Sequence, residues 1–478
     1  MNNQAVRAYI KKDILLEYIM SNNTVAQHSR AAFVSKLGGL LAVAGSAVGL
    51  GNIWRFPTQV GENGGSAFLL VYMGIILLFG VPLLLSEFVI GRRARANVGR
   101  AYTELAPGSR WGIVGMGSSL VAFAIFCYYV IIVAWVLYYF VQSLTGQLTA
   151  GGEGAHFKEQ FTDFITNPYW PIVCTAVTMG IIHFIIQAGV EKGIERSSKF
   201  LMPALFIILL VLAVVAIFMP GAQEGYRFLF DFDPKQVTPS VCLSALGQCF
   251  YSFSIGMGLV TYASYFGRNV NLSRTALTVG GLDTMVAILA GLIIFPAVFS
   301  VPGLSPSSGA GLVFVSLPEV FSTAFSGNAI LTWFVPTLFY FILFVAAVTS
   351  AMFLHEVATA FVQEKIGYSR KKSATLISVS SLIVACVASL SLGPWDFIRP
   401  FGMNLVDFLD YMTSKIILPL TGLGSAIFIG WVMKKEDVID EITSGGTFRF
   451  VWSRMFLFII RYIVPVLILV IMVSQFVM

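Results

Sequence analysis

Residues 45–57 read Gly-Ser-Ala-Val-Gly-Leu-Gly-Asn-Ile-Trp-Arg-Phe-Pro and lie in the middle of the first long apolar segment. Closely spaced glycines, an asparagine, an arginine and a proline are residues that a membrane-spanning helix usually avoids. Irregular backbone at membrane depth is tolerated only where it lines a cavity or is buried in protein. The stretch therefore predicts an interrupted helix that forms a ligand site.

The rest of the chain is strongly apolar. It has 478 residues, of which 57% are hydrophobic and 11% are charged, and its mean hydropathy is +0.83. Soluble domains carry about 25% charged residues, and a membrane span needs roughly 20 apolar residues. The segments that qualify are 37–60, 66–91, 111–145, 169–188, 200–219, 240–267, 275–301, 329–362, 374–392, 403–433 and 452–476. We expect an all-α polytopic membrane protein with 11 transmembrane helices and a single membrane domain, 37–478.

The net charge of +6 is unevenly distributed, because most arginines and lysines fall in alternate loops. By the positive-inside rule this places the N-terminus and the tail, residues 1–36, in the cytoplasm. The charge therefore reflects topology in a lipid bilayer, and no nucleic acid partner is expected. We expect the protein to lie in the cell inner (plasma) membrane. The five cysteines lie within spans and are expected to be core residues.

A second interruption lies in the sixth span, where residues 247–258 again combine glycines with hydroxyl side chains. Glycine-rich spans can also be close-packing motifs. Interrupted helices 1 and 6 instead predict two five-helix halves, and because five is odd the second half is inverted. Paired broken helices are typical of transporters that bind their substrate between the repeats. We expect repeat one at 37–219, repeat two at 240–433 and an extra helix at 452–476.

The first motif, followed by Glu62-Asn63-Gly64-Gly65, resembles the neurotransmitter:sodium symporter family. The likeness continues through Tyr128-Tyr129, Lys192–Arg196, Thr261–Tyr265, Leu317–Phe321 and Thr349-Ser350. The resemblance implies the LeuT-like 5+5 inverted repeat and sodium-coupled uptake of a small molecule. A homodimer is an assembly that such a chain could form.

The resemblance also implies a substrate site. It puts a carboxylate against the free amides of Leu50 and Gly51 and the hydroxyl of Tyr129, and the positive end of a broken helix favours an anion. Family members that carry amines have an acidic residue where this chain has Gly49, so a hydrophobic L-amino acid is expected. The pocket matched to the family comprises Ala47, Ile125, Tyr251, Ser252, Ser254, Met257, Ser350 and Leu354. Met257 between two glycines favours larger hydrophobic or aromatic substrates.

Two sodium (Na+) sites follow from the same resemblance, and no other cofactor is expected. The first uses Ala47, Asn52, Ser252 and Asp283, and the second uses Gly45, Val48, Ala346, Thr349 and Ser350. Asp283 departs from LeuT, which carries asparagine at this position. A buried carboxylate in a span is functional by default. We infer that Asp283 replaces the chloride of animal relatives and makes transport chloride-independent.

Gates are expected to be charged pairs that form on one side at a time. By resemblance Arg55 with Asp410 is the outer pair, and Arg30 with Glu364 the inner pair, assisted by Tyr265. In helix 5, Gly193 and Pro203 match a motif at which the helix unwinds. Proline at a helix start is the alternative interpretation of that spacing.

Rival functions lack their motifs. His355-Glu356 has no second histidine to complete a zinc motif, and no nucleophile elbow or phosphate loop is present, so the chain is not expected to be an enzyme. A repeated channel filter is also absent from the sequence. The alternative that stays open is a non-transporting amino-acid sensor on the same fold.

Overall fold

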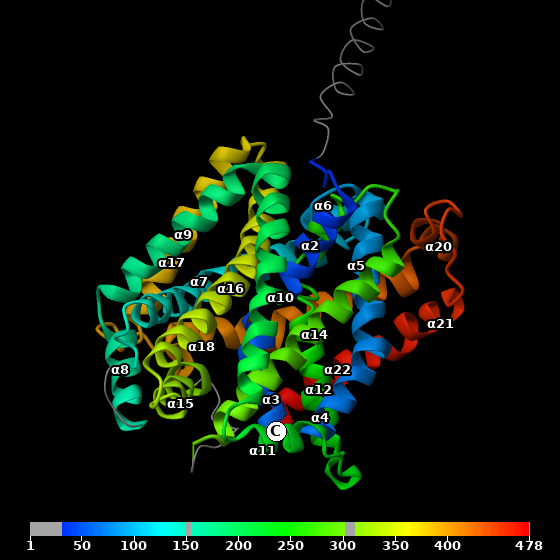
Figure 1. The fold of residues 1–478 in the computed structure, drawn as a ribbon. Helices are drawn as coiled ribbons and strands as arrows, with labels where there is room; N and C mark the ends of the chain where they lie inside the picture. Colours follow the sequence, from blue (N-terminus) through cyan, green and yellow to red (C-terminus); the bar gives the residue numbers. More distant parts are fainter. Residues whose placement is uncertain (1–30, 150–153, 302–310, 478) are drawn as a thin grey trace, which may run out of the picture.

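The computed structural model describes residues 31–149, 154–301 and 311–477, and this part of the chain consists of helices and loops without a strand (Figure 1). The first half holds α2 (Lys36–Ala47), η1 (Gly51–Arg55), α3 (Phe56–Glu62), α4 (Ser66–Ile75), η2 (Ile76–Gly80), α5 (Val81–Ala94), α6 (Val98–Leu105), α7 (Gly112–Leu144), α8 (Gly154–Thr166), α9 (Trp170–Gln187), η3 (Val190–Glu195), α10 (Arg196–Ile217) and α11 (Ala222–Phe230).

The second half begins with a short turn. It holds η4 (Pro234–Gln236), α12 (Pro239–Ser252), α13 (Leu259–Ala263), α14 (Leu272–Phe299), η5 (Leu312–Ser316), α15 (Leu317–Ala324), α16 (Ala329–Ile366), α17 (Arg370–Leu390), η6 (Pro400–Gly402), α18 (Leu405–Asp410), η7 (Tyr411–Ile417), α19 (Leu418–Ile427), η8 (Phe428–Val432), α20 (Lys435–Thr443), α21 (Ser453–Phe458), η9 (Ile459–Ile463) and α22 (Val464–Val477).

The helices are long and apolar enough to confirm an all-α polytopic membrane protein. Nine helices of the described chain can each cross a membrane, and α2 with the segment Gly51–Glu62, bent by 49°, makes a tenth. The predicted sixth span is not one continuous helix, because six non-helical residues separate α12 from α13. That break is the interruption expected from the sequence.

Helix 1 breaks where its glycines lie. Val48 leaves the helical region with φ −77° and ψ 106°. The side-chain oxygen of Asn52 then accepts a hydrogen bond from the Gly49 amide at 3.0 Å. The residue that restarts the helix therefore satisfies one of the amides that the break exposes.

Helix 6 breaks through positive φ angles at Ser254 (52°), Gly256 (79°) and Gly258 (92°). Only glycine adopts this conformation without strain, so Ser254 needs outside support. Its hydroxyl donates to the Ser46 carbonyl at 2.9 Å, and the Gly256 amide donates to Glu87 Oε1 at 2.8 Å. Helices 1 to 11 are numbered in the order of the predicted spans. The two broken helices, 1 and 6, are therefore bonded to each other and to helix 2, which comprises α4, η2 and α5.

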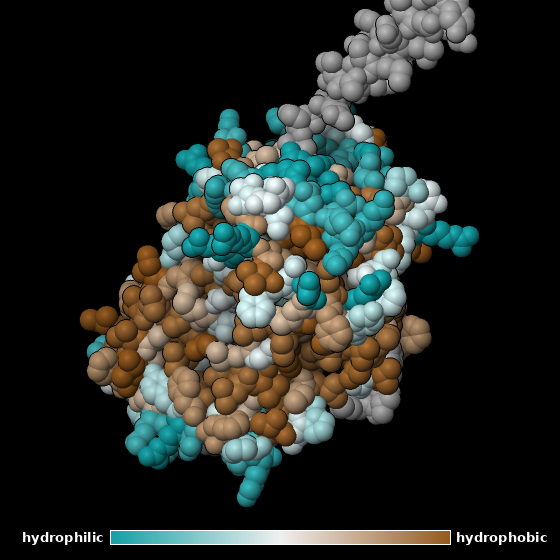
Figure 2. All heavy atoms as spheres, turned by 90° about the vertical axis from the view of Figure 1, so that its right-hand side faces the viewer, coloured by the Kyte–Doolittle hydropathy of each residue, from teal (hydrophilic) through white to brown (hydrophobic). Residues whose placement is uncertain are grey.

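The bundle has two polar ends and an apolar belt between them, visible on the face drawn in Figure 2. The end that carries α6 and α20 lies at the top of Figure 1 and is called the basic end. The opposite end carries α8, α11, α15 and α18, and is called the vestibule end because a large cavity opens there.

Candidate functional site

A small pocket lies between the two breaks. Its cavity volume is about 40 Å³, close to that of one or two water molecules. The residues that line it are Ser46, Ala47, Gly49, Leu50, Gly51, Ile125, Tyr129, Tyr251, Ser252, Ser254, Met257, Ser350, Phe353 and Leu354. Every substrate-site residue matched by resemblance is among them. Sequence reasoning missed Ser46 and Phe353, because apolar or small residues inside a span carry no signal that separates pocket wall from core.

Tyr129 is the polar group most available to a ligand in this pocket. Its hydroxyl is buried, and no hydrogen bond of normal geometry joins it to the described residues, although the Leu50 amide and the Ser350 hydroxyl lie near it. A buried hydroxyl without such a bond costs free energy, so it is expected to bind a polar ligand group. Leu50 and Gly51, at the start of the second half of helix 1, line the same pocket. The Tyr129 hydroxyl and the start of a helical segment beside it together suit an anionic group of a ligand.

Gly49 leaves no room for a side chain. A Cβ atom there would lie 2.3 Å from Ser350 Oγ and 3.4 Å from the Tyr129 hydroxyl. An acidic residue at this position would therefore displace Ser350. Gly49, which lines the substrate pocket, thus lies directly against Ser350, a residue of the second predicted sodium site.

The first predicted sodium site surrounds a buried carboxylate. Asn52 Nδ2 donates to Asp283 Oδ1 at 2.7 Å and to the Asp283 carbonyl at 3.1 Å. Ser252 Oγ donates to the two carboxylate oxygens at 2.9 and 3.1 Å, and the Tyr72 hydroxyl donates to Oδ2 at 3.4 Å. Asp283 is fully buried. Helices 1, 2, 6 and 7 thus converge on one buried carboxyl group.

The second predicted site is built of neutral oxygens. Ser350 Oγ lies 3.3 Å from the Gly45 carbonyl and 3.4 Å from the Val48 carbonyl. Thr349 Oγ1 bonds to the Ala346 carbonyl at 2.9 Å. Carbonyl and hydroxyl oxygens are the ligands that a hard cation prefers. The bend of helix 1 therefore turns two carbonyls toward the hydroxyls of helix 8.

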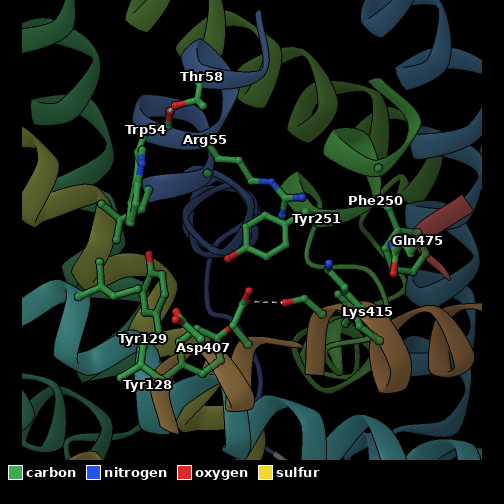
Figure 3. A pocket seen from close by; sticks show the side chains of 18 of the residues that line it. Trp54, Arg55, Thr58, Tyr128, Tyr129, Phe250, Tyr251, Asp407, Lys415 and Gln475 are labelled. Atoms are coloured by element: carbon green, nitrogen blue, oxygen red, sulfur yellow. Dashed lines mark hydrogen bonds between the residues drawn. The ribbon is translucent and has the colours of Figure 1, made fainter. Parts of the chain in front are cut away.

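A cavity of about 680 Å³ lies between the pocket and the vestibule end. Its lining includes Leu50, Gly51, Tyr129 and Tyr251, which also line the small pocket, so the two spaces adjoin. Figure 3 shows Arg55, from η1, and Asp407 and Lys415, from the span Leu405–Val432, pointing into this cavity. A polar molecule can thus reach the pocket from this end.

The predicted outer gate is not an ion pair in this structure. The Arg55 guanidinium lies over the ring of Tyr251, 4.3 Å from its centroid (Figure 3). Asp410 Oδ1 accepts hydrogen bonds from the hydroxyls of Tyr128 and Ser414, each at 2.9 Å. The ion pairs found among the described residues do not include Arg55 with Asp410. The two groups thus line the same cavity without pairing.

The basic end is closed by buried charges. Glu356 is fully buried and accepts from Arg370 Nη1 at 3.0 Å, from Arg370 Nη2 at 2.7 Å and from the Tyr265 hydroxyl at 2.7 Å. Glu364 Oε2 accepts from Asn97 Nδ2 at 2.7 Å. Arg30 lies outside the described residues, so the inner pair stays a prediction. Sequence reasoning missed the Glu356–Arg370 pair, whose members lie 14 positions apart on two helices.

Helix 5 is continuous around the motif predicted to unwind. Gly193 lies in η3, and Pro203 lies inside α10. A Cβ atom on Gly193 would lie 1.9 Å from the Ile185 carbonyl oxygen, so glycine is needed for the close approach of α9. Unwinding at these residues stays a prediction.

Two broken helices, a pocket at their breaks and oxygen clusters beside it define the chain as a secondary transporter of the LeuT fold. The model of the sodium:neurotransmitter symporter family matches residues 30–164 and 156–478. The chain therefore belongs to that family, whose members are sodium-coupled symporters and not enzymes.

Known relatives agree with this assignment. An uncharacterized sodium-dependent transporter of Haemophilus influenzae is 36% identical over 95% of this chain and 99% of its own length. An uncharacterized sodium-dependent transporter of Bacillus subtilis is 33% identical over 94% of this chain and 98% of its own length. The crystal structure of MhsT in complex with L-phenylalanine is 42% identical, has a TM-score of 0.84, and matches 93% of this chain and 100% of MhsT.

Proposed function

We propose that this protein is a sodium-coupled symporter that imports hydrophobic or aromatic L-amino acids by alternating access. The observation that carries the proposal is the pocket between the two breaks, where Tyr129 presents a hydroxyl that makes no hydrogen bond of normal geometry with the described residues and Met257, Ile125 and Leu354 form an apolar wall. The MhsT complex with L-phenylalanine supports an aromatic ligand for this type of site. The basic end is proposed to face the cytoplasm of a plasma membrane.

Coupling is proposed to arise because substrate and sodium share residues. Ser252 and Ala47 line the pocket and belong to the first predicted sodium site. Ser350 lines the pocket and approaches the Gly45 and Val48 carbonyls of the second. A ligand that orders either set lowers the free energy of ordering the other, and this coupling is reciprocal. Two sodium ions are expected per cycle.

Uptake by purified protein in proteoliposomes tests the proposal. Under an inward sodium gradient we expect accumulation of radiolabelled L-phenylalanine, competition by large hydrophobic amino acids, and loss of uptake when potassium replaces sodium. A non-transporting sensor would bind phenylalanine in the presence of sodium without accumulating it. That result would reject the transport function while leaving the binding site intact.

Chloride independence is proposed from Asp283, a carboxylate that contacts both Asn52 and Ser252. A fixed negative charge at this position balances sodium without a bound anion. We expect wild-type uptake to be unchanged when gluconate replaces chloride. Asp283→Asn is expected to abolish uptake in gluconate and to regain part of it in chloride, whereas an unchanged rate in gluconate would contradict the assignment.

A further inference from the structure

Arg461 is an arginine inside a membrane span. It lies eight positions after Ser453, the first residue of the span Ser453–Gln475, which is roughly 12 Å along a helix axis. Its side chain is exposed on the outside of the bundle. A charge at this depth is costly unless it reaches a polar partner.

The described part of the chain supplies no acidic partner for this guanidinium. Arg461 takes part in none of the ion pairs found among the described residues, and no hydrogen bond from its side chain is found there. Its five N–H groups therefore need an acceptor from outside the protein.

The guanidinium is nevertheless held in place. It lies over the indole ring of Trp431, 4.4 Å from the ring centroid, and 6.0 Å from the centroid of Tyr462. Trp431 is itself fixed, because its Nε1 donates to the Arg461 carbonyl at 3.2 Å. Stacking uses the flat face of a guanidinium and leaves its N–H edge free, which is the edge that binds a phosphate through two hydrogen bonds.

The backbone departs from the regular α-helix at both Arg461 and Trp431. Both Arg461 and Trp431 lie in π-helical turns, η9 and η8, which are common at functional sites. A Cβ atom on Gly430 would lie 3.0 Å from the Arg461 Cα, so the two helices are as close there as a glycine permits. The stacked arrangement therefore depends on the contact between helices 10 and 11.

The surroundings favour a lipid over a soluble anion. Phe458, Trp431 and Tyr462 are about half exposed and surround the arginine with apolar surface. Arg454 lies seven positions earlier, close to two helical turns, and is also exposed. The face of the molecule in Figure 2 shows hydrophilic residues reaching from the basic end into the upper part of the apolar belt.

We propose that Arg461 and Trp431 form a binding site for the phosphate of an anionic phospholipid in the leaflet at the basic end. The acyl chains would lie along the exposed apolar face of helix 11, and Arg454 would add attraction for the negative headgroup. This site is separate from the substrate pocket and does not depend on the transport function.

Native mass spectrometry of the purified protein titrated with phosphatidylglycerol or phosphatidylcholine tests the site. Wild type is expected to bind one phosphatidylglycerol more tightly than the rest, and Arg461→Gln to weaken that binding at least about tenfold. Lys372→Gln, at an exposed lysine of the same end, is the matched control and is expected to change affinity less than about twofold.

Trp431→Leu keeps the charge and removes the stacking, so an intermediate loss is expected; it also serves if Arg461→Gln does not fold. The proposal is overturned if Arg461→Gln binds like wild type, if phosphatidylcholine binds as tightly, or if millimolar inorganic phosphate displaces the lipid. The last result would identify a soluble-anion site instead.

Discussion

The two ends of the bundle are built differently around the same pocket. At the vestibule end, Arg55 and Asp410 face a cavity of about 680 Å³ and are engaged with Tyr251 and with hydroxyls. At the basic end, Glu356 is fully buried and paired with Arg370. One end thus opens on a large cavity, while the other holds an ion pair whose carboxylate is fully buried and whose arginine is only 20% exposed.

The difference shows where a transporter of this kind must expend free energy. A buried pair costs several kcal/mol to separate, whereas a pair in a wet cavity costs little. Opening the basic end therefore needs a compensating gain, which sodium and substrate binding at the breaks of helices 1 and 6 can provide.

Glu356→Gln should have the largest effect, because it leaves Arg370 without a buried carboxylate. We expect a loss of about 3–5 kcal/mol in the free energy that holds the basic end closed. Uptake should be abolished, and an engineered cysteine at the basic end should react faster with a polar thiol reagent. Asp396→Asn, which breaks the half-exposed pair with Arg399, should cost less than about 1 kcal/mol. Equal effects of the two variants would contradict the contrast.

Gly49→Ala should damage the pocket by steric overlap with Ser350. Overlap of this kind costs about 1–3 kcal/mol, or roughly 5–150-fold in affinity for sodium and substrate. Equilibrium binding of labelled phenylalanine at graded sodium concentrations measures it. Gly74→Ala is the control, because a Cβ atom on Gly74 would have no neighbouring atom within 4 Å. Wild-type affinity in Gly49→Ala would show that the pocket relaxes easily.

Arg55→Gln should separate transport from binding. Since Arg55 and Asp410 are not paired in the open vestibule, we expect substrate affinity to change less than about threefold while the uptake rate falls about tenfold. Asp410→Asn should act alike, and the double variant should be no slower than either single one. Additive losses in this cycle would mean that the two groups do not form a gate.

Lys199→Gln should have the smallest effect. Lys199 pairs with Glu195 at 2.7 Å but is about 42% exposed, so its removal should cost less than about 1 kcal/mol. Glu195 still accepts hydrogen bonds from the amides of Val34 and Ser35 at 2.7 and 3.1 Å. Thermal unfolding should therefore show a larger shift for Glu195→Gln, which weakens those bonds, than for Lys199→Gln.

Much of the fold could be predicted because its signals are local. Apolar segments of about 20 residues define spans without reference to one another. Glycines at 49, 51, 256 and 258 mark the breaks because closely spaced glycines weaken a helix and allow positive φ angles. Family resemblance then supplied the substrate-site residues, which line one pocket in the structure.

Contacts between distant helices could not be predicted in the same way. Sequence alone does not tell that Glu356 lies opposite Arg370, that Phe353 borders the pocket, or that Arg461 stacks on Trp431. Each depends on the rotation of one helix against another, and that rotation is set by packing of whole faces.

Composition and backbone preference act over a few neighbouring residues, so they are enough to define the class of protein, the positions of the breaks and the chemistry available there. Which end opens on a cavity, which charges are buried together and which aromatic ring lies under Arg461 follow from how the helices pack. Packing brings together side chains that lie 14 positions apart, as in Glu356 and Arg370, or 231 positions apart, as in Asn52 and Asp283.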